Sequence, residues 1–150
     1  MYYFKKVEIS NFRSIYHQEI ECSEYNLFCG LNDVGKSNVL KALNLFFNGK
    51  TDFQAPLNFQ SDYNKISLAK AQKSAKQKQL IKIKVTFNIP EGYKSLSDLK
   101  DFSIEKTFDR SGREELRYSD PNSKKRASMS RIMSKVKFVY IPALKGESVI

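Results

Sequence analysis

The chain has 150 residues and a mass of 17.4 kDa, with 26 Lys and Arg residues against 16 Asp and Glu, so its net charge is +10. Hydrophobic residues make up 41% of the chain and aromatic residues 13%, which excludes intrinsic disorder and predicts one packed domain. The longest apolar run, residues 138–144, contains a proline and is far shorter than the ~18 residues that span a bilayer. The N-terminal sequence also lacks the order of a secretory signal. We therefore expect a cytoplasmic protein with no membrane partner.

The positive charge is concentrated in two segments. Residues 65–84 hold seven lysines, from Lys65 to Lys84, and residues 124–137 hold six basic residues, from Lys124 to Lys137; neither segment contains an acid. The rest of the chain is slightly acidic. Such clusters attract nucleic acid without sequence specificity, although a solvated helix face and a mobile loop would give the same pattern.

Hydrophobic periodicity predicts alternating strands and helices along the chain. Alternation with period two indicates strands, spacings of three and four indicate helices, and Gly or Pro clusters mark their ends. In chain order we expect a strand at 2–9, a strand at 19–22, a buried strand at 26–29 and a helix at 37–47, one face of which carries Val39, Leu40, Leu43, Phe46 and Phe47. An irregular segment at 50–64, a helix at 65–79, a strand at 80–89 and a short helix at 95–100 are expected next. The chain then continues with a hairpin of 102–108 with 114–118, a basic loop at 121–125, a helix at 127–135 and a strand at 136–141.

The most specific motif is a phosphate-binding loop. Residues 30–37 read Gly-Leu-Asn-Asp-Val-Gly-Lys-Ser, which fits G-x-x-x-x-G-K-[ST] between a short apolar run and an amphipathic helix. A glycine turn that only starts a helix does not require Lys-Ser at these positions. The context of strand, glycine loop and helix therefore predicts a P-loop.

Each residue type in this motif has a role in holding a nucleotide. Gly30 and Gly35 allow the backbone amides to converge on phosphate oxygens, and the helix that follows adds its positive dipole end. Lys36 is expected to reach the β- and γ-phosphates, and the Ser37 hydroxyl is expected to ligate Mg²⁺. The predicted cofactors are ATP and Mg²⁺, and the cradle residues that we assign are Gly30, Asp33, Val34, Gly35, Lys36, Ser37 and Asn38.

A hydrolytic site needs an acid at the end of an apolar strand, and the sequence offers only weak candidates. Glu91 follows the strand expected at 80–89, and Glu147 lies well beyond the strand expected at 136–141. We assign no catalytic residue, and His17 is expected to be an ordinary loop residue. The chain is therefore expected to bind nucleotide and to hydrolyse it poorly, as the N-terminal piece of a longer protein.

Two stretches carry a resemblance to a known family. Ile-Ser-Asn-Phe-Arg-Ser-Ile at 9–15 and the P-loop and helix at 30–43 resemble the opening of ABC-type ATPases of the RecF, SMC and Rad50 kind. The chain is most similar to the OLD-family nucleases and related anti-phage ATPases of the Septu and retron-associated types, whose later strand is similar to residues 138–144. The resemblance implies an α/β P-loop fold with a mixed sheet and an antiparallel element at 80–118, with residues 1–150 as the N-terminal lobe. Walker B, the signature motif and any nuclease domain are then expected beyond residue 150.

The resemblance also implies roles for three further residues. Asn32 is expected near the γ-phosphate, and Arg13 is expected to approach the nucleotide phosphates, although a surface arginine after a strand is the alternative. Family members have a glutamine that senses Mg²⁺, for which Gln60 is the candidate here.

The function implied is ATP-driven dimerisation of two such lobes, coupled to DNA engagement or to a nuclease or toxin partner, in phage defence. A DNA repair ATPase like RecF and SMC, and a scaffold that holds ATP without hydrolysis, remain as alternatives.

Overall fold

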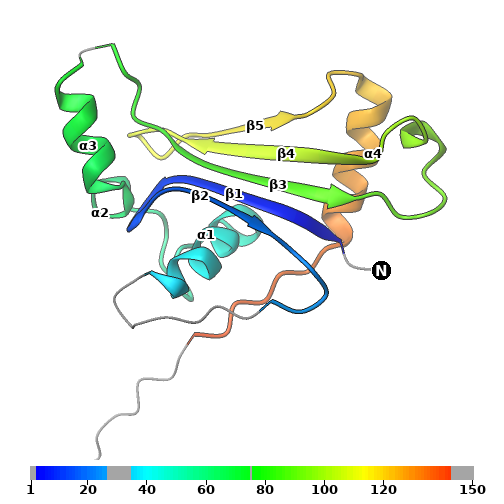
Figure 1. Cartoon of the computed structure of the whole chain (residues 1–150), viewed down its shortest axis with the longest axis horizontal. Helices are drawn as coiled ribbons and strands as arrows, with labels where there is room; N and C mark the ends of the chain where they lie inside the picture. Colours follow the sequence, from blue (N-terminus) through cyan, green and yellow to red (C-terminus); the bar gives the residue numbers. More distant parts are fainter. Residues whose placement is uncertain (1–2, 27–34, 75, 143–150) are drawn as a thin grey trace, which may run out of the picture.

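The centre of the molecule is a five-stranded sheet with the order β2-β1-β3-β4-β5, in which every neighbouring pair is antiparallel (Figure 1). The computed structural model describes residues 3–26, 35–74 and 76–142. The strands are β1 (Phe4–Phe12), β2 (Ile15–Glu21), β3 (Ile81–Asn88), β4 (Asp101–Phe108) and β5 (Glu114–Tyr118). The helices are α1 (Lys36–Asn48), α2 (Phe59–Asp62), α3 (Lys65–Gln72), α4 (Ser123–Lys135) and the 3₁₀ turn η1 (Lys94–Leu96).

The two faces of the sheet differ because apolar and charged residues alternate along the central strands. In β3, four alternate residues from Ile81 to Phe87 are fully buried, whereas Lys82 and Lys84 lie between them on the other face. Lys84 stands opposite Glu8 of β1 and Glu105 of β4, and its Nζ is 3.6 Å from a Glu8 oxygen. The open face is therefore mixed in charge, although β3 alone is basic.

Helix α1 packs against β1 and β3 on the buried face of the sheet (Figure 1). Val39, Leu43 and Phe46 face this core as expected, but Leu40 is 38% exposed, so its predicted position on the buried face is wrong. The face of α1 that packs against the sheet instead includes Ala42 and Leu45, which are buried, so the buried face is turned away from Leu40.

Two helices have different ends from those expected. Helix α3 ends at Gln72, not at 79, because Ala71 is its last buried residue and the described residues that follow, 73–74 and 76–78, are exposed, so no burial stabilises further turns. Helix α4 begins at Ser123, within the expected basic loop, because the Asn122 side chain accepts the amides of Lys124 at 3.0 Å and Lys125 at 3.3 Å. The segment expected to be irregular contains α2.

The strand expected at 136–141 is wrong. Within the described residues this segment pairs with no strand, and it is held by side-chain contacts to α1 instead. The Phe138 ring stacks on Phe47 at 5.6 Å between centroids, and the Phe138 carbonyl accepts a hydrogen bond from Asn48 Nδ2 at 3.1 Å. Most of the strand expected at 26–29 lies outside the described residues, so the described sheet is purely antiparallel, not mixed.

Helix α4 completes the core at the end of the sheet near η1. Met129 and Ile132 are fully buried and join the same apolar cluster as the sheet and α1. None of the helices in the described ranges is both long and apolar enough to cross a bilayer.

Candidate nucleotide-binding site

The start of α1 is the structural feature around which the predicted site is arranged. Gly35 precedes the helix in the left-handed region, with φ 77°, and Lys36 is the first helical residue. A Cβ at Gly35 would overlap the Ser14 hydroxyl, so any other residue here would have to displace that hydroxyl as well as adopt a strained backbone conformation. This close approach brings the β1–β2 turn against the first turn of α1.

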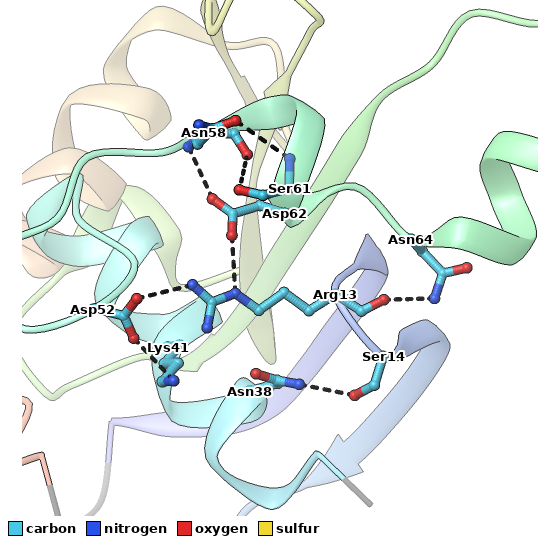
Figure 2. Close-up of polar contacts among 9 residues, drawn as sticks. All are labelled: Arg13, Ser14, Asn38, Lys41, Asp52, Asn58, Ser61, Asp62 and Asn64. Atoms are coloured by element: carbon cyan, nitrogen blue, oxygen red, sulfur yellow. Dashed lines mark hydrogen bonds and ion pairs between the residues drawn. The ribbon is translucent and has the colours of Figure 1, made fainter. Parts of the chain in front are cut away.

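The first turn of α1 is suited to an anion. It contains no acidic residue, and no side chain from the described part of the chain caps it. Its amide groups therefore retain the partial positive charge of a helix N-terminus. Ser14 and Asn38 fix this end in place, because Asn38 Nδ2 donates to Ser14 Oγ at 2.8 Å (Figure 2).

The β1–β2 turn is itself held by an unusual backbone. Asn11 and Arg13 both have positive φ, 65° and 50°, which costs free energy unless the surroundings compensate. Both carbonyls are bonded to Asn64, whose amide donates to the Asn11 oxygen at 3.0 Å and whose side chain donates to the Arg13 oxygen at 2.7 Å. The Asn11 side chain accepts from Ser67 Oγ at 2.6 Å and donates to the Leu80 carbonyl at 2.8 Å. The turn is thereby tied to α3.

Two carboxylates hold the Arg13 side chain. Its Nε donates to Asp62 Oδ1 at 3.0 Å and its terminal nitrogen donates to Asp52 Oδ2 at 3.1 Å (Figure 2). Asp52 also pairs with Lys41 of α1 at 2.9 Å. Arg13 thus links the turn, α2 and α1 in one network.

The network shifts the ionisation of its members. The Lys41 ammonium, followed by Arg13, holds the pKa of Asp52 below its usual value despite partial burial. Burial opposes the charge of Arg13, but the bonds to Asp52 and Asp62 outweigh it and raise the pKa of the guanidinium. Both shifts favour the charged forms, so Asp52 and Arg13 are both charged at neutral pH.

The structure brings together most of the expected site residues that it describes. Arg13 lies on the turn beside Gly35, and Lys36, Ser37 and Asn38 form the first turn of α1. Gln60 is exposed on α2 and does not line the hollow of about 590 Å³ between Arg13, Ser14 and the start of α3. The remaining cradle residues lie outside the described residues; they are Gly30, Asn32, Asp33 and Val34.

Sequence reasoning missed the partners of Arg13. Asp52 and Asp62 lie in a polar segment without periodicity, and Lys41 is only one of several helix lysines. The available signal was the pair of acids in a segment that otherwise lacks charge apart from its first lysine. Across residues 3–26, 35–74 and 76–142, no group of three His, Cys, Asp or Glu residues is arranged to hold a metal ion.

The sheet, the P-loop sequence and the helix that follows it have the P-loop ATPase fold of the ABC type, which RecF and SMC heads share. The chain belongs to the AAA ATPase domain family, which it matches over residues 3–143. The fold class expected from the sequence is confirmed.

Curated relatives match a short stretch. The chain is 42% identical over 50 residues to the DNA replication and repair protein RecF of Thermoanaerobacter sp. (strain X514), and the same values hold for RecF of Thermoanaerobacter pseudethanolicus. The match covers 33% of this chain and 14% of RecF, so it spans a small part of those relatives.

Solved structures share the fold over most of the chain. A RecF–ATP structure matches with a TM-score of 0.55 and 21% identity, covering 78% of this chain and 26% of RecF. A structure from work on ATP-driven dimerization and DNA-stimulated activation of SMC ATPases matches with a TM-score of 0.59 and 19% identity. The match covers 89% of this chain and 76% of that one. An SMC head bound to the C-winged helix domain of ScpA matches with a TM-score of 0.61 and 17% identity, covering 91% of this chain and 42% of the SMC chain.

Proposed function

We propose that the first turn of α1 and the loop before it bind the phosphates of ATP. The observation that supports this is Gly35, which has a positive φ and whose Cβ, if it had one, would meet the Ser14 hydroxyl. Gly35 lies directly before a helix start that has neither a side-chain cap nor an acid among the described residues. Lys36 supplies the charge for the β- and γ-phosphates, with amides from Gly30, Asp33, Val34 and Gly35 and with Asn32 and Asn38 beside them.

We propose oxygen ligands for Mg²⁺ from this chain. The Ser37 hydroxyl is exposed on the first turn of α1 and suits a hard cation that keeps most of its water and binds the phosphates. Gln60 is the second candidate, from α2. Mg²⁺ bound there would neutralise phosphate charge, and the Ser37 hydroxyl would be the residue of this chain that holds it.

The direct test is titration of the protein with ATP and Mg²⁺ by calorimetry. Lys36→Ala is expected to weaken ATP binding by about a hundredfold, since a charge-assisted contact contributes roughly 1.5–3 kcal/mol. Lys124→Ala, an exposed lysine on α4, is the matched control and should leave the affinity unchanged. Near-normal affinity of Lys36→Ala would remove the site assignment.

We propose further that residues 1–150 are the N-terminal lobe of an ABC-type ATPase and that a second subunit completes each site. The short coverage of RecF supports this, as does the position of Glu91, which is exposed in the connection between β3 and η1 and does not reach α1 by any bond within the described residues. The chain on its own is then expected to bind ATP with little turnover. Sedimentation of the protein with and without ATP tests the dimer.

For the biological role, we propose that ATP-dependent closure controls DNA engagement or a partner nuclease or toxin in anti-phage defence, as in OLD-type proteins. The identity to RecF favours the alternative of a DNA repair ATPase. Protection of host cells against phage that is lost in Lys36→Ala supports defence, whereas sensitivity to DNA damage in the same variant supports repair. ATP turnover by the whole protein distinguishes both from a scaffold that holds nucleotide without hydrolysis.

A further inference from the structure

One end of the sheet carries a hollow that the nucleotide site does not use. Ile81, the first residue of β3, pairs with Phe108, the last residue of β4, so the connection before β3 and the β4–β5 turn emerge side by side. Between them lies a hollow of about 680 Å³. Its charged lining residues are Lys78, Asp109, Arg110, Arg113 and Glu115.

The basic residues of this hollow are available to an external anion. Lys78, Arg110 and Arg113 are exposed, and none of them forms an ion pair with another described residue. Asp109 is turned inward on its own loop, where one carboxylate oxygen accepts from the Ser111 hydroxyl at 2.6 Å and from the Arg113 amide at 3.0 Å. The turn is thus pre-formed, and the Asp109 charge is engaged within it.

The remaining acid in the hollow is also partly compensated. Glu115 lies 3.6 Å from the Arg117 guanidinium, and both side chains are exposed. The hollow therefore combines three cations that form no ion pair within the described residues with two carboxylates that already have partners, although the Arg113 charge also acts on Asp109. This balance favours a ligand with several negative charges.

The positive surface continues from this hollow toward the open face of the sheet. A second hollow of about 430 Å³ shares Gln77 with the first and is lined by Lys70, Lys82 and Tyr16. Lys70 Nζ lies 4.4 Å from the centre of the Tyr16 ring and is held there by the ring and its hydroxyl. The two hollows form a track with a cation at each step, which fits a polyanion and not a single small anion.

The second basic segment of the sequence lies elsewhere. Helix α4 is at the opposite end of the sheet from α3 (Figure 1). Its Lys125 is bound to Asp98 at 2.6 Å and to Asp120 at 3.2 Å. The two basic segments of the sequence, residues 65–84 and 124–137, therefore do not form one surface. Arg110 and Arg113 belong to neither segment, but they lie in the same hollow as Lys78 of the first segment.

We propose that this track, formed by Arg110 and Arg113 of the β4–β5 turn, Lys78, Lys70 and Lys82, binds the phosphodiester backbone of duplex DNA without sequence specificity. Helix α4 takes no part in this binding. This proposal rests on the proposed role in DNA engagement and names its surface. Cations on long flexible side chains contact phosphates and carry no base code, so affinity depends on salt and not on sequence.

The test uses a labelled duplex of random sequence and two matched triple variants of the protein. Lys78→Gln with Arg110→Gln and Arg113→Gln removes three charges from the track, and Lys124→Gln with Arg126→Gln and Arg131→Gln removes three exposed charges from α4. The track variant is expected to lose at least about tenfold in affinity at moderate salt and to reduce the salt slope by about 2 to 3, near 0.9 per phosphate contact. The α4 variant should keep the wild-type slope.

Equal losses in both triple variants would show a net-charge effect and overturn the proposal, as would a flat salt response of the wild-type protein. Preference for an acidic peptide over the duplex would also overturn it. Restoring charge with Lys78→Arg, Arg110→Lys and Arg113→Lys should recover binding, which separates charge loss from misfolding. ATP titration without DNA should be unchanged in the track variant, so failure here is distinct from failure of the nucleotide site.

Discussion

Arg13 and Asp62 are bonded to each other through both backbone and side chain. The Arg13 amide donates to the Asp62 carbonyl at 2.6 Å, and Arg13 Nε donates to Asp62 Oδ1 at 3.0 Å. The other Asp62 oxygen accepts the Asn58 amide at 2.9 Å, and Asp62 is only 4% exposed. The pair therefore fixes the β1–β2 turn against α2, while the bond from Asn38 to Ser14 ties the same turn to the start of α1.

Arg13→Ala is expected to destabilise the fold by about 3 kcal/mol, because it leaves the buried Asp62 carboxylate without its cation. Urea denaturation measures the change. Arg117→Ala removes an exposed arginine from its pair with Glu115 and should cost less than about 0.5 kcal/mol. Similar costs for the two variants would contradict a structural role of the buried pair. If Arg13 also contacts phosphates, ATP affinity should fall further than it does in Asp62→Asn.

Gly35→Ala should be more destabilising than Gly49→Ala, although both glycines have a positive φ near 70° to 80°. At Gly49 a Cβ meets nothing within 4 Å, so the cost is the conformational one of about 1 kcal/mol. At Gly35 the added Cβ also overlaps the Ser14 hydroxyl. Thermal unfolding compares the two variants. Adding Ser14→Gly to Gly35→Ala should recover only the part of the stability loss that is caused by the steric overlap. If the double variant is no more stable than Gly35→Ala, the overlap with the Ser14 hydroxyl does not contribute.

Lys41→Met should raise the pKa of Asp52, because Lys41 is the main cause of its depression. The folded-state pKa lies below that of the unfolded chain, so the pair stabilises the protein above about pH 4 and this contribution is lost as the pH falls through the folded-state pKa. Since Asp52 is about half exposed, the stabilisation is at most ~1 kcal/mol. NMR titration of the carboxyl group measures the shift, with Lys100→Met as a control that should leave it unchanged.

Lys106→Met should loosen the C-terminal end of α1. Lys106 Nζ reaches from β4 to the Phe46 carbonyl at 2.7 Å and pairs with Glu114 at 2.9 Å, and α1 has no basic residue of its own in its last turn. Loss of this charge from a partly buried helix end is expected to cost about 1–2 kcal/mol. Hydrogen exchange of α1 amides should rise at its last turn and not at its first. A uniform rise along the helix would indicate a general packing defect instead.

The sequence by itself predicted the helix that follows the P-loop motif and the strands with a period-two pattern. The motif formed by Gly30, Gly35, Lys36 and Ser37 can be recognised from the sequence because its residues are close together in the chain. Strand β3 could be predicted because burial of one face alone gives its sequence a period of two. The ends of α3 and α4 could not be predicted as well, since one depends on where burial stops and the other on an asparagine cap.

Only the tertiary structure decided how distant charges meet. Arg13, Asp52 and Asp62 are far apart in the chain, and their network exists because the β1–β2 turn, α2 and α1 pack together. The lysines of β3 seemed part of one basic segment, but antiparallel pairing sets Lys84 between Glu8 and Glu105. Pairing also placed Arg110 and Arg113 beside Lys78, because adjacent strand ends bring together residues that no local pattern connects.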